Sequence, residues 1–460
     1  MRIIFTILIL SSFLILNTCK NDHSSFNNSI KYDLNEIKER GRLIAVTSFN
    51  SVDYFIYKGR PMGFQLDLLL DYAEYSGLQL EIKACTDIKE AYRMLMNGEC
   101  DVIAMDLLQN ESHQKLINYT HTIRNSDFVL VQNTANKENF ISNLKQLDGK
   151  RIYVPRYSGS AEILMAIEEK EKIDIDIHQV RKTNEELITK VAENDIDYTI
   201  SDRGVSIVNK KNYSNIDNSM AVSDFYNFTW ATRKQSELLK SALNQWIDIA
   251  KKTSRYSHIY ANYFTNNRTQ NIVKSDYYVV STGKLSMYDD NIKTYSNQLD
   301  WDWRLLASLI YSESKFNNQS RSCRGAYGLM QIMPITATHF GYDTIISPDY
   351  NLKVGVKLLK QLEKVFINQI PDKDERLKFV LASYNIGLGH ILDARRLAEK
   401  YGKNPNNWDD VLSFLLKKSD KQFYSDPVVQ HGRCVGKQTS KYVDNVLSIY
   451  MHYRNIPIVE

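Results

Sequence analysis

The residues that could do chemistry lie in the stretch SLIYSESKFNNQSRSCRGAYGLMQIMP, residues 308–334, which contains a single carboxylate, Glu313. Leu306 and Ile310 precede Glu313 at helical spacing, so its carboxyl group is predicted to lie on the apolar stripe that faces the core. Burial disfavours the charged form of a carboxyl group and raises its pKa. A carboxyl group that stays protonated near neutral pH can serve as a general acid, and this is the chemistry that we expect here.

The alternative is that Glu313 is an ordinary residue at a helix end, exposed or paired with Arg304 or Lys315. The residues that follow favour the catalytic interpretation. Gly325 and Gly328 allow positive φ angles and a close approach of the backbone, and the proline after GLMQIM suits the first turn of a further helix. We therefore expect a helix that carries the acid, a Gly-containing loop beside it and a second helix.

Four motifs follow one another in this half of the chain: ESKFN (313–317), SCRGAYGLMQIMP (322–334), SYNIGLG (383–389) and TSKYV (439–443). Together they resemble the soluble lytic transglycosylase family, whose domain has a lysozyme-like, all-α-dominated fold. The resemblance implies that one carboxyl group suffices. Glu313 would protonate the glycosidic oxygen between MurNAc and GlcNAc. It would then accept the proton of the C6 hydroxyl group, which closes a 1,6-anhydro ring without water.

The same resemblance implies roles for six further side chains, Ser322, Gln331, Met333, Tyr384, Asn385 and Tyr442. The serine and glutamine would hydrogen-bond the N-acetyl group or the surroundings of the acid, and the methionine would form part of the groove wall. The Tyr–Asn pair would lie opposite, and the last tyrosine would close the site. Core packing is the alternative for the methionine, and helix capping for the Tyr–Asn pair. One departure is Gln438, where the family commonly has an acidic residue.

Strand and helix patterns alternate from LIAVT at residue 43 to a helix that ends near residue 252, which predicts two α/β lobes. The segments GFQLDL, NGECDVIAMDL, DGKRIYVPRYSGSAE and NDIDYTISD resemble the family-3 solute-binding proteins over residues 40–255. In amino-acid-binding members an arginine grips the ligand carboxylate, and an aspartate pairs with its ammonium group. Here His113 stands nearest the place of the arginine, and Asp202 at that of the aspartate, with capping as its alternative role. Without a guanidinium group the expected ligand is a muropeptide rather than a free amino acid.

The first residues, MRIIFTILILSSFLILNTC, place one arginine before an apolar run that is too short to span a membrane. We interpret residues 1–18 as a signal peptide. LNTC resembles a bacterial lipobox, so Cys19 is predicted to carry a lipid and residues 19–39 to form a tether. Ordinary cleavage without a lipid is the alternative. The protein is therefore expected in the cell envelope, anchored in the outer membrane and facing the periplasm.

Export leaves four cysteines after the lipobox, an even number that permits two disulfides. We expect a Cys323–Cys434 bridge that ties the last helix to the loop after the acid, and a second bridge between Cys85 and Cys100, although other pairings stay open. The sequence has no C-x-x-C or H-E-x-x-H motif, so no metal and no cofactor are expected. The net charge of +4 is too small to indicate a nucleic-acid partner.

The sequence thus predicts a two-lobed α/β binding domain over residues 40–255, a linker over 256–285 and a lysozyme-like helical domain over 286–460. The expected activity is non-hydrolytic cleavage of peptidoglycan glycan strands, with a muropeptide bound to the first domain as a regulator. Two alternatives differ in their products. One is a lipoprotein that senses the cell wall without cutting it, and the other is a lysozyme-type hydrolase whose second carboxylate comes from a distant part of the chain.

Overall fold

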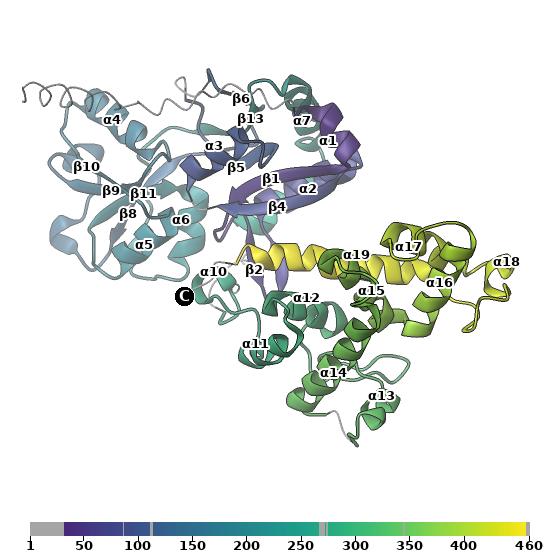
Figure 1. Ribbon diagram of the computed structural model, residues 1–460. Coiled ribbons are helices and arrows are strands. Elements are labelled where there is room, and N and C mark those ends of the chain that lie inside the picture. Colours follow the sequence, from purple (N-terminus) through teal and green to yellow (C-terminus); the bar gives the residue numbers. More distant parts are fainter. Residues whose placement is uncertain are drawn as a thin grey trace, which may run out of the picture.

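The computed structural model describes residues 32–85, 87–110, 114–265, 272, 275–343 and 346–456. Figure 1 shows an α/β part built from the first half of the chain and a helical part built from the second. This confirms the fold class expected from the sequence. The signal peptide, Cys19 and His113 lie outside the described residues, so the interpretations made of them stay predictions.

The first lobe of the α/β part is a sheet with the strand order β4-β1-β5-β13-β6, and β7 pairs with β13. β1 is parallel to β4 and β5, whereas β13 is antiparallel to β5. The strands are β1 (Arg42–Ser48), β4 (Gln79–Cys85), β5 (Val102–Leu107), β6 (Ile117–Tyr119), β7 (Arg124–Ser126) and β13 (Tyr226–Arg233). The helices are α1 (Leu34–Arg40), α2 (Phe64–Ser76), α3 (Ile88–Met96) and α7 (Glu237–Ala250). Helices lie against the sheet, so β5 can begin with a buried apolar run over residues 102–105, before the polar Asp106.

The second lobe is a sheet with the order β10-β9-β11-β8-β12. Its strands are β8 (Phe128–Asn133), β9 (Arg151–Pro155), β10 (Asp176–Val180), β11 (Tyr198–Asp202) and β12 (Ile216–Asp217). Its helices are α4 (Ser160–Glu171), α5 (Asn184–Ala192) and α6 (Arg203–Lys210), with the 3-10 turns η1 (Lys137–Asn139) and η2 (Leu144–Leu147). The chain enters this lobe between β7 and β8 and leaves it between β12 and β13, so two crossings connect the lobes.

The helical part begins after residues 256–285, the stretch predicted as a linker. This stretch is not an extended tether: it contains most of α8 (Ser254–Tyr260), the π-helix η3 (Ala261–Thr265) and α10 (Val279–Thr282). It also packs on the first lobe, because the ring of Phe264 lies 5.0 Å from that of Phe64 on α2. The helices that follow are α11 (Asp289–Ser296), η4 (Asn297–Leu299), α12 (Trp303–Ser314), α13 (Pro334–His339), α14 (Pro348–Phe366), α15 (Lys373–Ile386), α16 (Leu388–Lys400), α17 (Trp408–Lys417), α18 (Lys421–Tyr424) and α19 (Gly436–Arg454).

The helix α12 has sharply defined ends. Asp302 caps its first turn by accepting a hydrogen bond from the backbone N–H of Arg304. At the other end Lys315 and Phe316 both have positive φ angles, 54° and 61°, which are costly for residues other than glycine. The helix therefore ends at Ser314, one residue after Glu313, and the chain turns away directly beside the acid.

A β-hairpin of the first lobe reaches into the helical part. It consists of β2 (Phe55–Tyr57) and β3 (Arg60–Met62), which pair antiparallel. At its tip the carbonyl oxygen of Gly59 accepts a hydrogen bond of 2.8 Å from Tyr453 on α19. A Cβ atom added to Gly59 would lie 2.6 Å from the rings of Tyr311 and Phe316. In Figure 1 α19, in yellow, runs from beside β2 to beside α17.

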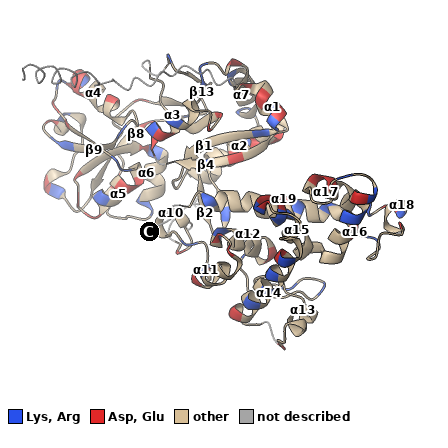
Figure 2. Cartoon of the chain, viewed as in Figure 1, with Lys and Arg blue, Asp and Glu red and all other residues tan. Residues whose placement is uncertain are grey.

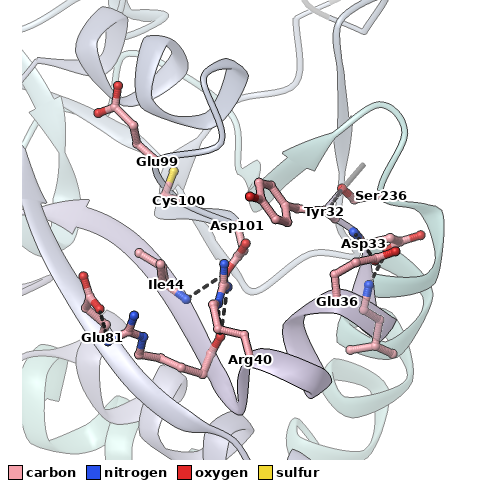
Figure 3. A network of polar contacts seen from close by, with 12 residues as sticks. Tyr32, Asp33, Glu36, Arg40, Ile44, Glu81, Glu99, Cys100, Asp101 and Ser236 are labelled. Carbon is pink, nitrogen blue, oxygen red and sulfur yellow. Dashed lines mark hydrogen bonds and ion pairs between the residues drawn. The ribbon is translucent and has the colours of Figure 1, made fainter. Parts of the chain in front are cut away.

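The start of the α/β part is held by a buried ionic network, which Figure 3 shows from close by. Asp101 is 1% exposed and accepts hydrogen bonds from Arg40 and from the backbone N–H of Ile44, the latter at 2.8 Å. Arg233 lies 3.4 Å from the same carboxylate and donates to the carbonyl oxygen of Tyr32 at 2.8 Å. The network joins α1 to strands that are far apart in the sequence.

Charged residues of both signs are interspersed over both parts in Figure 2, in keeping with the small net charge. Among the described residues, no helix combines the length and the apolar character that crossing a membrane requires.

Candidate active site

Glu313 lies in the last turn of α12 and is half-buried. Burial raises the pKa of its carboxyl group from 4.5 to about 7, and a hydrogen bond from Tyr442 opposes part of this rise. Neither cation suggested as its partner is available. Arg304 forms an ion pair of 2.7 Å with Asp302, and the Lys315 ammonium group lies 3.9 Å from the ring centroid of Tyr311. The sequence-based expectation of a buried acid with a raised pKa is therefore confirmed, and the alternative of an ion-paired helix end is wrong.

Tyr442 is the one described side chain that hydrogen-bonds the carboxyl group of Glu313. Its hydroxyl group donates to Oε1 over 2.6 Å. The tyrosine comes from α19, as expected from the TSKYV motif, and burial together with the neighbouring Glu313 raises its own pKa well above 10. Tyr442 therefore stays a proton donor at any pH at which the acid works, and it stabilises the carboxylate form of Glu313.

The loop over residues 320–333 is held mainly by its own contacts. The backbone groups of Ser322 and Ala326 bond at 2.9 Å, and the Ser322 hydroxyl group accepts from the Ala326 N–H, also at 2.9 Å. Gln331 donates from its side-chain amide to the carbonyl oxygens of Ser320 and Gly328 at 3.1 and 3.0 Å. In this structure both predicted substrate contacts thus shape the loop, and their expected bonds to an N-acetyl group stay predictions.

A residue that sequence reasoning missed fixes this loop from outside. Asn351 on α14 is fully buried, accepts from the N–H of Met330 at 2.7 Å and donates to the carbonyl oxygen of Tyr327 at 2.8 Å. A Cβ atom on Gly328 would lie 2.4 Å from the Asn351 amide nitrogen, so glycine is required there for this close approach. No sequence motif marks Asn351, which lies about twenty residues after the loop.

The SYN motif reaches the site from α15. Tyr384 donates to the carbonyl oxygen of Met330 at 2.7 Å, and burial together with the charge of Glu313 raises its pKa well above 10. Asn385 is exposed and accepts a hydrogen bond of 2.9 Å from Thr439, which ties α15 to the start of α19. Met333 is 37% exposed at the start of α13, so it is not a core residue.

The predicted disulfides are wrong in this structure, because Cys85, Cys100, Cys323 and Cys434 are all free thiols. Cys434 is buried just before α19, and its N–H donates to the carbonyl oxygen of Lys418, whereas Cys323 is exposed on the active-site loop. The last helix is joined to the rest of the site by Tyr442 and Thr439 instead.

In the α/β part, both oxygens of Asp202 are bonded within the chain. Oδ1 accepts from the N–H of Val205, which caps α6, and the two oxygens accept from the guanidinium group of Arg124 at 3.0 and 3.3 Å. The capping alternative for Asp202 is therefore correct, and in this conformation its carboxylate is not open to a ligand ammonium group.

Taken together, the helical part presents one partly buried carboxyl group that is protonated up to neutral pH, next to a tyrosine that supports its ionised form. Such a group can give a proton to a leaving oxygen and take one back in the next step. No metal-binding group of three or more His, Cys, Asp or Glu side chains occurs among the described residues.

Comparisons with known proteins identify both parts. The model of the bacterial extracellular solute-binding proteins, family 3, matches residues 42–266, and that of the transglycosylase SLT domain matches residues 290–407. A protein of Desulfosudis oleivorans named membrane-bound lytic murein transglycosylase F is 28% identical over 418 residues, which cover 90% of either chain. Its namesake from Actinobacillus succinogenes is 29% identical and covers 89% of this chain and 84% of its own. Among solved structures, holo ArgBP from T. maritima is 20% identical, with a TM-score of 0.43, and covers 49% of this chain and 97% of its own. The two family resemblances seen in the sequence are confirmed.

Proposed function

We propose that this chain, which belongs with the two-domain lytic transglycosylases that it resembles over about nine-tenths of its length, cleaves peptidoglycan glycan strands without water. The bond that breaks is the β-1,4 bond between MurNAc and GlcNAc, and the product carries a 1,6-anhydro-MurNAc end. The observation that carries the proposal is Glu313: a half-buried carboxyl group with a pKa of about 7 and with Tyr442 as its hydrogen-bond partner.

In the first step Glu313 donates its proton to the glycosidic oxygen while the bond from that oxygen to C1 of MurNAc breaks. The N-acetyl carbonyl oxygen of the sugar helps to stabilise the cationic carbon. Glu313 is then a carboxylate, and the hydrogen bond from Tyr442 stabilises that charge. In the second step the C6 hydroxyl oxygen bonds to C1 and its proton passes to Glu313, which restores the acid.

The experiment that tests this function is digestion of purified peptidoglycan, with mass spectrometry of the soluble fragments. Anhydro-muropeptides are expected from the wild-type chain and none from Glu313→Gln, because an amide cannot give up a proton in this way. Fragments with reducing ends would mean a hydrolase, and the absence of fragments would mean a binding protein. Either result would overturn the proposal.

We further propose that the first domain regulates the second when a muropeptide binds between its lobes. The contact at the hairpin tip supports this, since Gly59 touches Tyr311 and Phe316, which flank the acid along the chain. A ligand bound between the lobes can move one lobe against the other, so it can shift this contact. A stem peptide added to the digestion should change the initial rate of the full-length chain, and an unchanged rate over a wide concentration range would contradict regulation.

The name of the relatives and the predicted lipobox support a place in the cell envelope. We propose a chain anchored to the cell envelope by a lipid on Cys19, with both domains exposed to peptidoglycan. Cys19→Ala should release the protein from the membrane fraction, and retention after a salt wash would exclude the lipid anchor.

A further inference from the structure

A buried arginine occupies the place where the two lobes of the α/β domain meet. Arg124 begins β7, at one of the two crossings between the lobes, and its side chain is 1% exposed. The Nε atom donates to Asp106 over 3.0 Å, and Nη2 contacts the same carboxylate. Nη1 and Nη2 donate to the two oxygens of Asp202 over 3.3 and 3.0 Å. One guanidinium group thus holds two carboxylates that come from different lobes.

The position of these carboxylates is that of a ligand site. Asp202 is the last residue of β11 in the second lobe, and Asp106 is the penultimate residue of β5 in the first. In open α/β sheets ligands bind in the crevice outside the carboxyl ends of the strands. A cavity of about 580 Å³ adjoins the cluster and is lined, among other residues, by Asp106, Tyr157 and Tyr226.

Two aromatic rings complete a cage for a planar cation. The central carbon of the Arg124 guanidinium group lies 4.6 Å from the ring centroid of Phe228 and 4.8 Å from that of Phe264. Aromatic faces attract cations at such distances, and most strongly where water is excluded. Phe264 belongs to the stretch between the two domains, so the arginine binds both lobes and the start of the connection to the helical part.

Neighbouring residues support the cluster of Arg124 and its two carboxylates. Asp106 also accepts a hydrogen bond of 2.9 Å from the amide of Gln65, whose oxygen accepts one of 2.7 Å from Trp230. A Cβ atom on Gly204 would lie 2.6 Å from the ring of Phe264 and 3.0 Å from Asp202, so only glycine lets the ring reach the cluster. A surface ion pair needs no such support.

We propose that the interlobe crevice contains a guanidinium site formed by Asp106, Asp202, Phe228 and Phe264, and that the chain fills this site with its own Arg124. Arg124 thereby excludes the cationic group of an external ligand from Asp202. It also holds the two lobes together in the absence of a ligand. Any ligand of this domain binds in the outer cavity instead. The inference concerns the first domain alone, and it stands whether or not the second domain cleaves glycan strands.

Chemical rescue of the full-length chain tests the proposal. Arg124→Ala empties the cage, and N-ethylguanidinium carries the atoms that this substitution removes beyond Cβ. The variant should melt roughly 10 °C below the wild type in its first domain, because two buried carboxylates lose their partner. Millimolar N-ethylguanidinium should restore much of that loss in a saturable manner, and ethylammonium, which lacks the planar fork, should restore far less.

Arg203→Ala is the matched control. Arg203 also forms a two-pronged pair, with Asp127 beside the same crossing, but its side chain is 35% exposed. N-ethylguanidinium should not stabilise this variant. Absence of rescue in Arg124→Ala, or equal rescue by both cations, would overturn the proposal.

A second measurement tests the proposal on the wild-type chain, so it does not depend on whether Arg124→Ala folds. Calorimetric titration of the wild-type chain with N-ethylguanidinium or free arginine should give no binding, because the site is filled. Saturable binding that Asp202→Asn abolishes would mean that the crevice is open to external cations, and the proposal would be wrong.

Discussion

Replacing Glu313 by glutamine should make the helical domain inactive and, at alkaline pH, more stable. The reason is the raised pKa of the carboxyl group, about 7 in the folded chain against an ordinary value of 4.5. Between these two pH values the folded chain holds a proton on Glu313 that the unfolded chain has lost. The free energy of unfolding therefore falls as the pH rises through this window, and above it the wild-type domain carries the full cost of a buried carboxylate.

The size of this cost follows from the shift. A difference of one pKa unit corresponds to about 1.4 kcal/mol, so the shift of Glu313 corresponds to about 3 kcal/mol. Glutamine has the same shape, cannot ionise and can accept the Tyr442 hydrogen bond through its amide oxygen. Relative to the wild type, Glu313→Gln should therefore gain about 3 kcal/mol between pH 4 and pH 8. For a domain of this size this corresponds to about 5–10 °C in melting temperature.

Differential scanning calorimetry of both proteins at pH 4, 6 and 8 measures the effect, because all other titrating groups are shared and cancel in the comparison. Glu399→Gln, at an exposed position of α16, is the matched control and should leave the pH dependence of the wild type unchanged. If Glu313→Gln and the wild type lose stability in parallel from pH 4 to pH 8, burial does not raise the pKa of this carboxyl group, and the acid assigned here is wrong.

Three further changes test the contacts around the site. Tyr442→Phe removes the O–H that lowers the pKa of Glu313, so the alkaline limb of the pH–rate profile should move up by about one pH unit, and an unmoved limb would refute the role of this bond. Gly59→Ala adds a Cβ atom against the helical domain, so it should impair digestion more than Gly77→Ala, where φ is equally positive but the space is open; equal activities would contradict coupling through the hairpin. Asp101→Ala removes the carboxylate that pairs with Arg40 and with the buried Arg233 and should cost the first domain about 3–5 kcal/mol in urea unfolding, whereas a loss below 1 kcal/mol would refute the network.

The sequence predicted those features of the fold and the site that depend on residues close together along the chain. The helical spacing before Glu313 predicted its burial, and alternating patterns predicted β1, α2 and β4 in the first lobe and β9, α4, β10, α5 and β11 in the second. The glycines and the proline of the active-site loop correctly indicated a tight turn followed by a helix, since Gly325 and Gly328 have φ angles of 87° and 81°. These features are local, so a single sequence can reveal them.

Contacts between distant segments could not be predicted in this way. Arg124 lies in the stretch NYTHTIRNSD, which has no motif, and only the folded chain brings its guanidinium group to Asp202, 78 positions later. The sequence pattern predicts a ligand site at Asp202 without the usual arginine, whereas the folded chain supplies an arginine from another strand. The disulfide prediction was wrong for a related reason. It rested on an even number of cysteines, and that number does not tell which cysteines lie close together in the folded chain.

The turn that ends α12 is stabilised by contacts from both domains. Lys315 and Phe316 hold left-handed conformations that cost of order 1–3 kcal/mol each, and such strain persists only where surrounding contacts stabilise it. Part of that support comes from the other domain, since the tip of its hairpin packs on Phe316 and bonds α19, the helix that also holds Tyr442 against Glu313. Loss of the hairpin contact would therefore act on both sides of the acid at once: it would loosen the turn after Glu313 and free the far end of the helix that carries its hydrogen-bond donor. A small movement of the first domain can thus alter the proton affinity of the acid without any direct contact with it.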